Sequence, residues 1–162
     1  MSRNPYAPPN ADVRDVTDLA ARSALTFRLY SPGQVALATF LGSPMAGAWF
    51  ISSNFKALAR PHEAQRALLF GVAGTVFVLF IAFLLPENLP NSIFPVIYTV
   101  AAHAVAKSLF AKTIAEHTSA GGSLGSGWRV VGVSLLILLA LLVVLFAVLL
   151  LLDLLGALPE EL

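Results

Sequence analysis

The sequence predicts an all-α membrane protein with four apolar helical segments. Its 162 residues are 57% hydrophobic and only 12% charged, and the mean hydropathy is +0.80. A soluble domain of this size needs more charged residues to cover its surface. The apolar stretches are each close to the roughly 20 residues that a helix needs to cross a bilayer. They lie at about 34–55, 67–85, 92–111 and 129–152.

The residues outside the apolar segments predict the organisation of the two tails, and the cysteine content and net charge exclude some kinds of chemistry. Residues 1–24 are polar and proline-bearing, so we expect a flexible tail there. We expect residues 25–155 to form one polytopic helical membrane domain, followed by a short acidic tail at 156–162. The chain has no cysteine, which excludes thiolate metal sites and cysteine catalysis. The net charge of +1 gives no electrostatic argument for binding nucleic acid.

The first apolar segment, 34–55, is interrupted near its middle. Gly42, Ser43 and Pro44 follow one another there, and Gly47 comes three residues later. Proline removes an N–H from the helix ladder, and glycine relaxes the steric limits on a turn. The segment is therefore either a kinked helix that still crosses the membrane or a re-entrant segment that enters and turns back. Because its length is sufficient to cross, we expect a kinked full span.

The distribution of positive charge favours the re-entrant alternative. Lysine and arginine mark the cytoplasmic side of a membrane protein. Four arginines, Arg3, Arg14, Arg22 and Arg28, precede the first apolar segment, and Lys56, Arg60 and Arg66 follow it. If all four segments span, these two basic clusters lie on opposite sides, whereas a re-entrant first segment puts both inside. We also interpret Lys56, Arg60 and Arg66 as a cytoplasmic docking surface.

The second segment, 67–85, carries no charge and would be roughly 28 Å long as a helix. The prolines of residues 86–91 predict a tight turn after it, and Pro95 falls in the first turn of the next helix, where it is tolerated. The leucine- and valine-rich fourth segment inserts by several kcal/mol on its own. These segments are predicted to be ordinary membrane-spanning helices.

Two shorter stretches carry weaker signals. Apolar and polar residues alternate over 25–30, which is the periodicity of a strand. A strand this short must pair with another segment, or else the stretch lies on the membrane surface. Residues 118–127, TSAGGSLGSG, have the composition of a flexible loop.

The third segment carries the main candidate functional residues. Thr99, His103 and Lys107 are spaced by four and share one helix face. Ionisable groups inside a membrane often mark ion paths or proton relays. The structural alternative is that Lys107 extends its ammonium to the headgroups while His103 bonds a neighbouring backbone or hydroxyl group. His62, His103 and His117 lie in separate segments without metal-ligand spacing, so we expect no metal site.

Several sequence blocks resemble a known family. Residues 28–47, RLYSPGQVALATFLGSPMAG, are followed by NFKALA, PENLPNSIFPVIYT and GWRVVG. This pattern resembles a family of small bacterial multi-pass inner-membrane proteins with a K/R-L-Y-S-P…A-T-F-L-G-G/S-P segment. The resemblance implies that three apolar helices follow the segment and that the chain lies in a bacterial inner membrane. It implies no catalytic residues.

Together these observations lead to one functional hypothesis and its alternatives. No catalytic constellation is present, so we expect no enzymatic activity and no cofactor. The hypothesis is a protein of the lipid bilayer that binds a membrane protein partner, as an accessory, assembly or immunity-type subunit, or forms a homo-oligomer. The alternative is a small oligomeric transporter or channel that uses His103 and Lys107. A lipid- or stress-responsive membrane scaffold is a third class.

Overall fold

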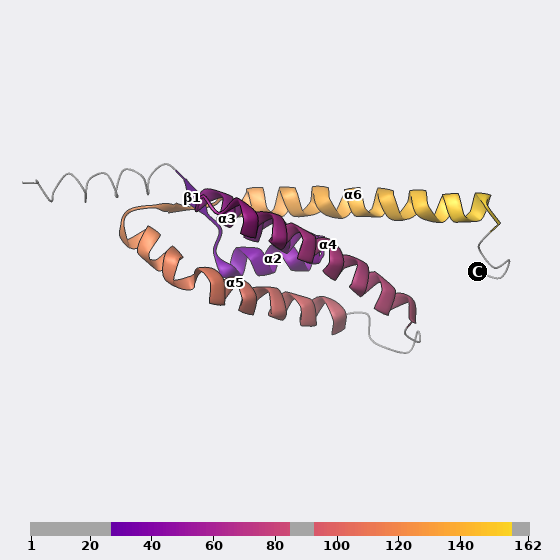
Figure 1. The fold of residues 1–162 in the computed structure, drawn as a ribbon, viewed down its shortest axis with the longest axis horizontal. Coiled ribbons are helices and arrows are strands. Elements are labelled where there is room, and N and C mark those ends of the chain that lie inside the picture. The colour runs from indigo at the N-terminus through magenta and orange to yellow at the C-terminus, as the bar shows by residue number, and fades with distance from the viewer. Residues whose placement is uncertain (1–26, 85–92, 157–162) are drawn as a thin grey trace, which may run out of the picture.

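The computed structural model describes residues 27–84 and 93–156. Within these ranges the chain forms five helices and two short strands (Figure 1). Three of the helices are long and apolar enough to cross a membrane: α4, α5 and α6. The prediction of a helical chain with helices suited to a membrane is confirmed for three of the four predicted segments. In chain order the elements are β1 (Arg28–Leu29), α2 (Pro32–Gly42), α3 (Pro44–Ala57), α4 (Pro61–Leu84), α5 (Ile93–Ser119), β2 (Ser123–Leu124) and α6 (Gly127–Leu154).

The first apolar segment folds as two short helices, so the prediction of a kinked full span is wrong. Helix α2 has 11 residues and α3 has 14, which makes them about 16 and 21 Å long, each short of the roughly 30 Å core. They meet at Ser43, whose φ of 88° and ψ of 170° turn the chain out of the helical path. Pro44 cannot donate a helical N–H and becomes the first residue of α3. We call residues 32–57 the helical hairpin.

The two ends of the helical hairpin are fastened to each other. The side chain of Asn54, near the end of α3, accepts a hydrogen bond from the Tyr30 N–H through Oδ1 at 2.8 Å. Its Nδ2 donates to the Tyr30 carbonyl oxygen, also at 2.8 Å. Tyr30 lies two residues before the start of α2, so the segment returns to the end of the molecule from which it started.

Local sequence explains where the first helix begins. The Ser31 hydroxyl accepts from the Gln34 N–H, and the Gln34 side chain accepts from the Ser31 N–H, which is a complete capping box. Pro32 occupies the first helical position, where its missing N–H has no consequence. Gln34 also donates through Nε2 to the carbonyl oxygen of Gly125, at 2.6 Å. This bond ties the start of α2 to the segment between β2 and α6.

The helical hairpin is the centre of the fold. Helix α3 packs along α4, while α2 packs against α5 and α6, so each of the three long helices packs mainly against the hairpin. Small residues allow these close approaches. A Cβ on Gly42 of α2 would lie 2.5 Å from the Ser134 carbonyl oxygen of α6, and a Cβ on Gly71 of α4 would overlap Ala48 of α3. Inside the hairpin, a Cβ on Gly47 would overlap the Thr39 side chain.

The buried core lies where the hairpin meets β1 and α5. Tyr30 packs edge-on against Phe50 with ring centroids 4.6 Å apart, and Phe55 packs in the same way against Phe110 at 4.9 Å. Phe50, Phe55 and Phe110 are almost fully buried. Away from this core the long helices diverge, as Figure 1 shows for α6. Every residue of α6 from 142 onward is exposed.

The strand periodicity found over 25–30 corresponds to a short parallel pair. Arg28 pairs with Ser123 and Leu29 with Leu124, and the Gly125 N–H donates to the Leu29 carbonyl oxygen at 2.9 Å. The prediction of a flexible loop over 118–127 is therefore wrong for this part of the stretch. The loop composition gave no sign that a distant strand offers it backbone partners.

The long helices extend beyond the apolar windows. Helix α4 begins at Pro61 rather than at residue 67, and α5 continues to Ser119 rather than ending at 111. The added turns carry charged residues that are compatible with a helix outside an apolar core. Pro95 lies in the first turn of α5, as predicted. The polar tail at 1–24, the turn at 86–91 and all but the first residue of the acidic tail lie outside the described residues.

Candidate functional site

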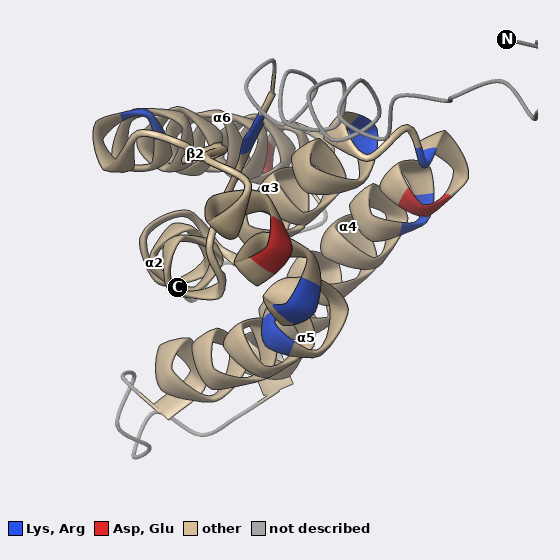
Figure 2. Cartoon of the chain, turned by 90° about the vertical axis from the view of Figure 1, so that its left-hand side faces the viewer, with Lys and Arg blue, Asp and Glu red and all other residues tan. Residues whose placement is uncertain are grey.

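Charged residues gather at the end of the molecule that carries β1 and β2. Figure 2 looks onto this end and shows lysine and arginine positions, coloured blue, on several helices around it. Toward the opposite end, the described residues include one charged side chain near the end of α6, Asp153. We call the end that carries β1 and β2 the basic end. The lysines and arginines of the described ranges are Arg28, Lys56, Arg60, Arg66, Lys107, Lys112 and Arg129.

The three residues predicted to form a docking surface have different environments. The Lys56 ammonium lies 5.8 Å from the centre of the Trp49 ring. The Arg60 guanidinium pairs with Glu63 at 2.8 Å and lies 5.2 Å from the Phe55 ring centre. Arg66 points into a groove between two helices, as described next. Lys56 therefore has its partner on its own helix, α3, and Arg60, in the turn between α3 and α4, has partners on both of these helices. Arg66 lines the groove.

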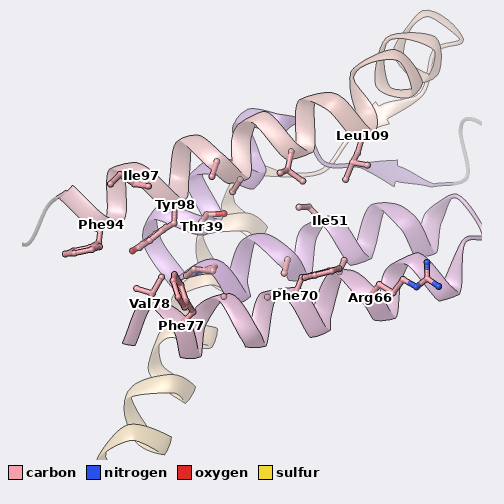
Figure 3. A pocket seen from close by; sticks show the side chains of 18 of the residues that line it. Thr39, Ile51, Arg66, Phe70, Phe77, Val78, Phe94, Ile97, Tyr98 and Leu109 are labelled. Carbon is pink, nitrogen blue, oxygen red and sulfur yellow. The ribbon is translucent and has the colours of Figure 1, made fainter. Parts of the chain in front are cut away.

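That groove runs between α4 and α5, with the helical hairpin as its floor (Figure 3). Its volume is about 810 Å³. Phe70 and Phe77 project into it from α4, and Ile97 and Tyr98 project from α5. Ile51 lies on the floor. We call this space the α4–α5 groove; it exists because both helices pack against the hairpin and not against each other.

The α4–α5 groove is apolar along its walls and charged at its mouth. Its polar lining side chains are Thr39, Tyr98, Glu63 and Arg66, and the last two lie toward the basic end. Glu63 accepts from both Nε and a terminal nitrogen of Arg60, at 3.1 and 2.8 Å. Among the residues that the structure describes, no carboxylate lies within ion-pair distance of Arg66. The mouth of the groove therefore presents a cation next to a carboxylate that is already paired.

Sequence reasoning missed this groove, although a signal for it exists. Ala67, Gly71 and Gly74 recur at spacings of four and three on α4 and line the groove wall. Such a stripe lets another backbone approach closely. In this chain Gly71 receives α3, and the stripe continues into open space beside it. The sequence does not show which part of this stripe packs against α3 and which part lines the groove, whereas the folded structure does.

The predicted polar face of α5 lies outside the groove. His103 and Lys107 are exposed, and neither lines the groove. Thr99 is half-buried, and within the described ranges its hydroxyl oxygen is buried without a hydrogen-bond partner. The three residues share a face by helical spacing. Their functional role stays a prediction.

A histidine that the sequence interpretation did not single out has a clear structural place. The His117 ring stacks on Phe27 with centroids 4.8 Å apart, and Nε2 lies 3.3 Å from the Ser123 carbonyl oxygen. This buried ring joins the end of α5 to the paired strands. Within residues 27–84 and 93–156, no group of three or more potential ligands could hold a metal ion.

Comparisons of the chain with protein-family models, curated proteins and solved structures give no match. No residue of the site therefore takes a role from a relative. The resemblance to a bacterial membrane-protein family stays a prediction.

Proposed function

We propose that this chain is a non-enzymatic multi-pass protein of the bacterial inner membrane that acts by binding another membrane protein. The role is that of an accessory, assembly or immunity-type subunit. The positive-inside rule orients the basic end toward the cytoplasm. In this orientation α4, α5 and α6 cross the membrane and the helical hairpin is re-entrant.

The observation that supports a protein partner is the bare distal part of α6. This helix packs against α2 through its first turns, whereas all residues from 142 to 154 are exposed. Helices in membranes associate through close packing of side chains, and α6 presents a continuous surface of leucine, valine and phenylalanine. A partner helix against this surface would complete a bundle that the three diverging helices leave open.

Site-specific photo-crosslinking in native membranes tests this proposal. A photoreactive residue at Phe146, on the bare part of α6, should yield an adduct of defined mass with a different protein. The matched control places the same residue at Val96, which is exposed on α5 outside the groove. Adducts with lipid alone at Phe146 would contradict the proposal. Adducts with a second copy of the chain would show that the partner is the protein itself, in a homo-oligomer.

The alternative function is a small oligomeric transporter or channel. The observation in its favour is that two ionisable side chains, His103 and Lys107, are exposed on a helix apolar enough to span a membrane. Because they lie outside the groove, a pore lined by them requires several copies with these faces turned inward. Ion flux into liposomes that is lost in the variant His103→Ala/Lys107→Leu, at unchanged protein abundance, would support this alternative.

A further inference from the structure

The α4–α5 groove has the dimensions of a ligand site. Its volume of about 810 Å³ falls within the roughly 300–1,000 Å³ typical of small-molecule pockets. Phe70, Ala101 and Val105 are among the apolar side chains that line its walls. Because α4 and α5 do not pack against each other, the groove opens sideways along helices that are apolar enough to span a membrane. A molecule can therefore enter it from within the bilayer.

A basic side chain lines the mouth of this groove on α4, and helical spacing places a second one beyond the lining residues of α5. Arg66 lines it from α4. On α5, Val105 and Leu109 line the groove, and Lys112 continues the same stripe at the spacing i, i+4, i+7. The Lys112 side chain is 91% exposed, and its nearest carboxylate, on Glu116, is 3.9 Å away. An exposed pair at this distance holds the ammonium weakly.

We propose that the α4–α5 groove binds an anionic phospholipid of the cytoplasmic leaflet. Its phosphate lies between Arg66 and Lys112, and its acyl chains lie along the apolar walls. The mouth of the groove is cationic and its walls are apolar, which matches the anionic headgroup and the apolar acyl chains of such a lipid. Basic pockets between membrane helices on the cytoplasmic side are suited to lipid headgroups. This inference shares only the membrane orientation with the proposed function and does not depend on a protein partner.

Charge complementarity favours the lipid over a protein helix in the groove. An apolar helix from a partner or from a second copy would fill the walls but would supply no counter-charge to Arg66, and would leave Lys112 with only its weak, exposed contact to Glu116. Glu63 cannot supply one without losing its bonds to Arg60. A lipid phosphate satisfies both cations at the depth where they lie.

The test uses the full-length chain in nanodiscs of phosphatidylcholine alone or of phosphatidylcholine mixed with phosphatidylglycerol. Native mass spectrometry measures which lipids remain bound after release from the disc. We expect the wild-type chain to retain phosphatidylglycerol in preference to phosphatidylcholine. Each basic residue near an anionic lipid contributes about fivefold to affinity. We therefore expect the preference to fall about fivefold in Arg66→Gln and further in Arg66→Gln/Lys112→Gln.

Two matched controls separate the groove from a general attraction to the basic end. Arg129→Gln removes an exposed cation from the start of α6, which does not line the groove, and it should keep the preference. Ala101→Trp fills the groove and should abolish retention, whereas Ala104→Trp, at an exposed α5 position outside the groove, should not.

Three outcomes would overturn the proposal. The first is equal retention of the two lipids by the wild-type chain. The second is a loss in Arg129→Gln as large as the loss in Arg66→Gln. The third is a photoreactive residue at Val105 that captures a protein helix and no lipid, because the groove would then belong to a partner or a second copy.

Discussion

The side-chain amide of Asn54 pairs with both backbone groups of Tyr30, at 2.8 Å for each hydrogen bond. This is the pairing that one strand offers another, supplied here by a fully buried side chain. It fixes the entrance of the helical hairpin beside its exit. Because α4 begins where the hairpin ends, this pairing also determines the end of the molecule from which α4 starts. The directions of the helices after α4 follow from that starting point.

Replacing Asn54 by leucine should destabilise the fold strongly. The substitution leaves the Tyr30 N–H and carbonyl oxygen buried without partners, and each such group costs about 1–3 kcal/mol. We expect the midpoint of thermal unfolding in detergent to fall by several degrees. Ser53→Ala, one residue away with its hydroxyl bonded within α3, is the control and should unfold near the wild-type temperature. Equal midpoints for Asn54→Leu and wild type would show that the pairing is dispensable.

Gly42→Val should separate the hairpin from α6. A Cβ at this position would lie 2.5 Å from the Ser134 carbonyl oxygen, and this atom belongs to a helix backbone that cannot give way locally. We expect faster cleavage between β2 and α6 in limited proteolysis. Gly132→Ala, on α6 with open space around it, should be neutral or slightly stabilising, since alanine is favoured over glycine in a helix by about 1 kcal/mol. Unchanged cleavage in Gly42→Val would argue against the α2–α6 contact.

Thr75→Val should weaken the contact between α3 and α4 modestly. The Thr75 hydroxyl oxygen accepts from the Met45 N–H at 3.0 Å, which satisfies a donor in the first turn of α3. Side-chain hydrogen bonds between membrane helices contribute about 0.6 kcal/mol on average and up to about 1.7. The expected loss of unfolding free energy is therefore about 1 kcal/mol. Thr118→Val, whose side chain bonds only within α5, should lose less.

Labelling of single cysteines should give a three-span topology. The natural chain has no cysteine, so an impermeant thiol reagent reports only the introduced one. Arg28→Cys and His62→Cys, before and after the helical hairpin, should react from the same side. Asp153→Cys, near the end of α6, should react from the other side. Reaction of Arg28→Cys and His62→Cys from opposite sides would restore the kinked full span.

The long helices were predictable from the sequence because apolar length alone specifies them. The leucine- and valine-rich stretch of α6 and the charge-free stretch of α4 were located to within a few residues of the apolar part. Their polar extensions were not located, because the apolar windows stop at Arg66 and Lys112 while α4 and α5 continue through these residues. Pro61 at the start of α4 is a helix-start signal that the windows do not contain.

The hairpin and the groove required tertiary information. Gly42, Ser43 and Pro44 marked the break, but a break permits both a kink and a reversal. The S-x-x-Q capping box at Ser31–Gln34 marks the start of α2 and would mark the start of a kinked span equally well. The local signal that favoured reversal is the polar run Ser52, Ser53 and Asn54 near the end of the segment. The periodicity over 25–30 indicated a strand at Arg28, but no local signal identified Ser123 as its partner. The α4–α5 groove follows from the separation of two helices, which periodicity does not encode.

The central place of the helical hairpin also has a consequence for the order of biosynthesis. The hairpin is translated before the helices that enclose it, and its contacts with Thr75, Gly125 and Ser134 form only as those later segments emerge. Until then its glycine-lined faces have no neighbour. Helix α6, which is translated after the hairpin, therefore completes the packing around α2. A chain truncated before α6 lacks this packing, and we expect membrane quality control to degrade it as a misfolded protein.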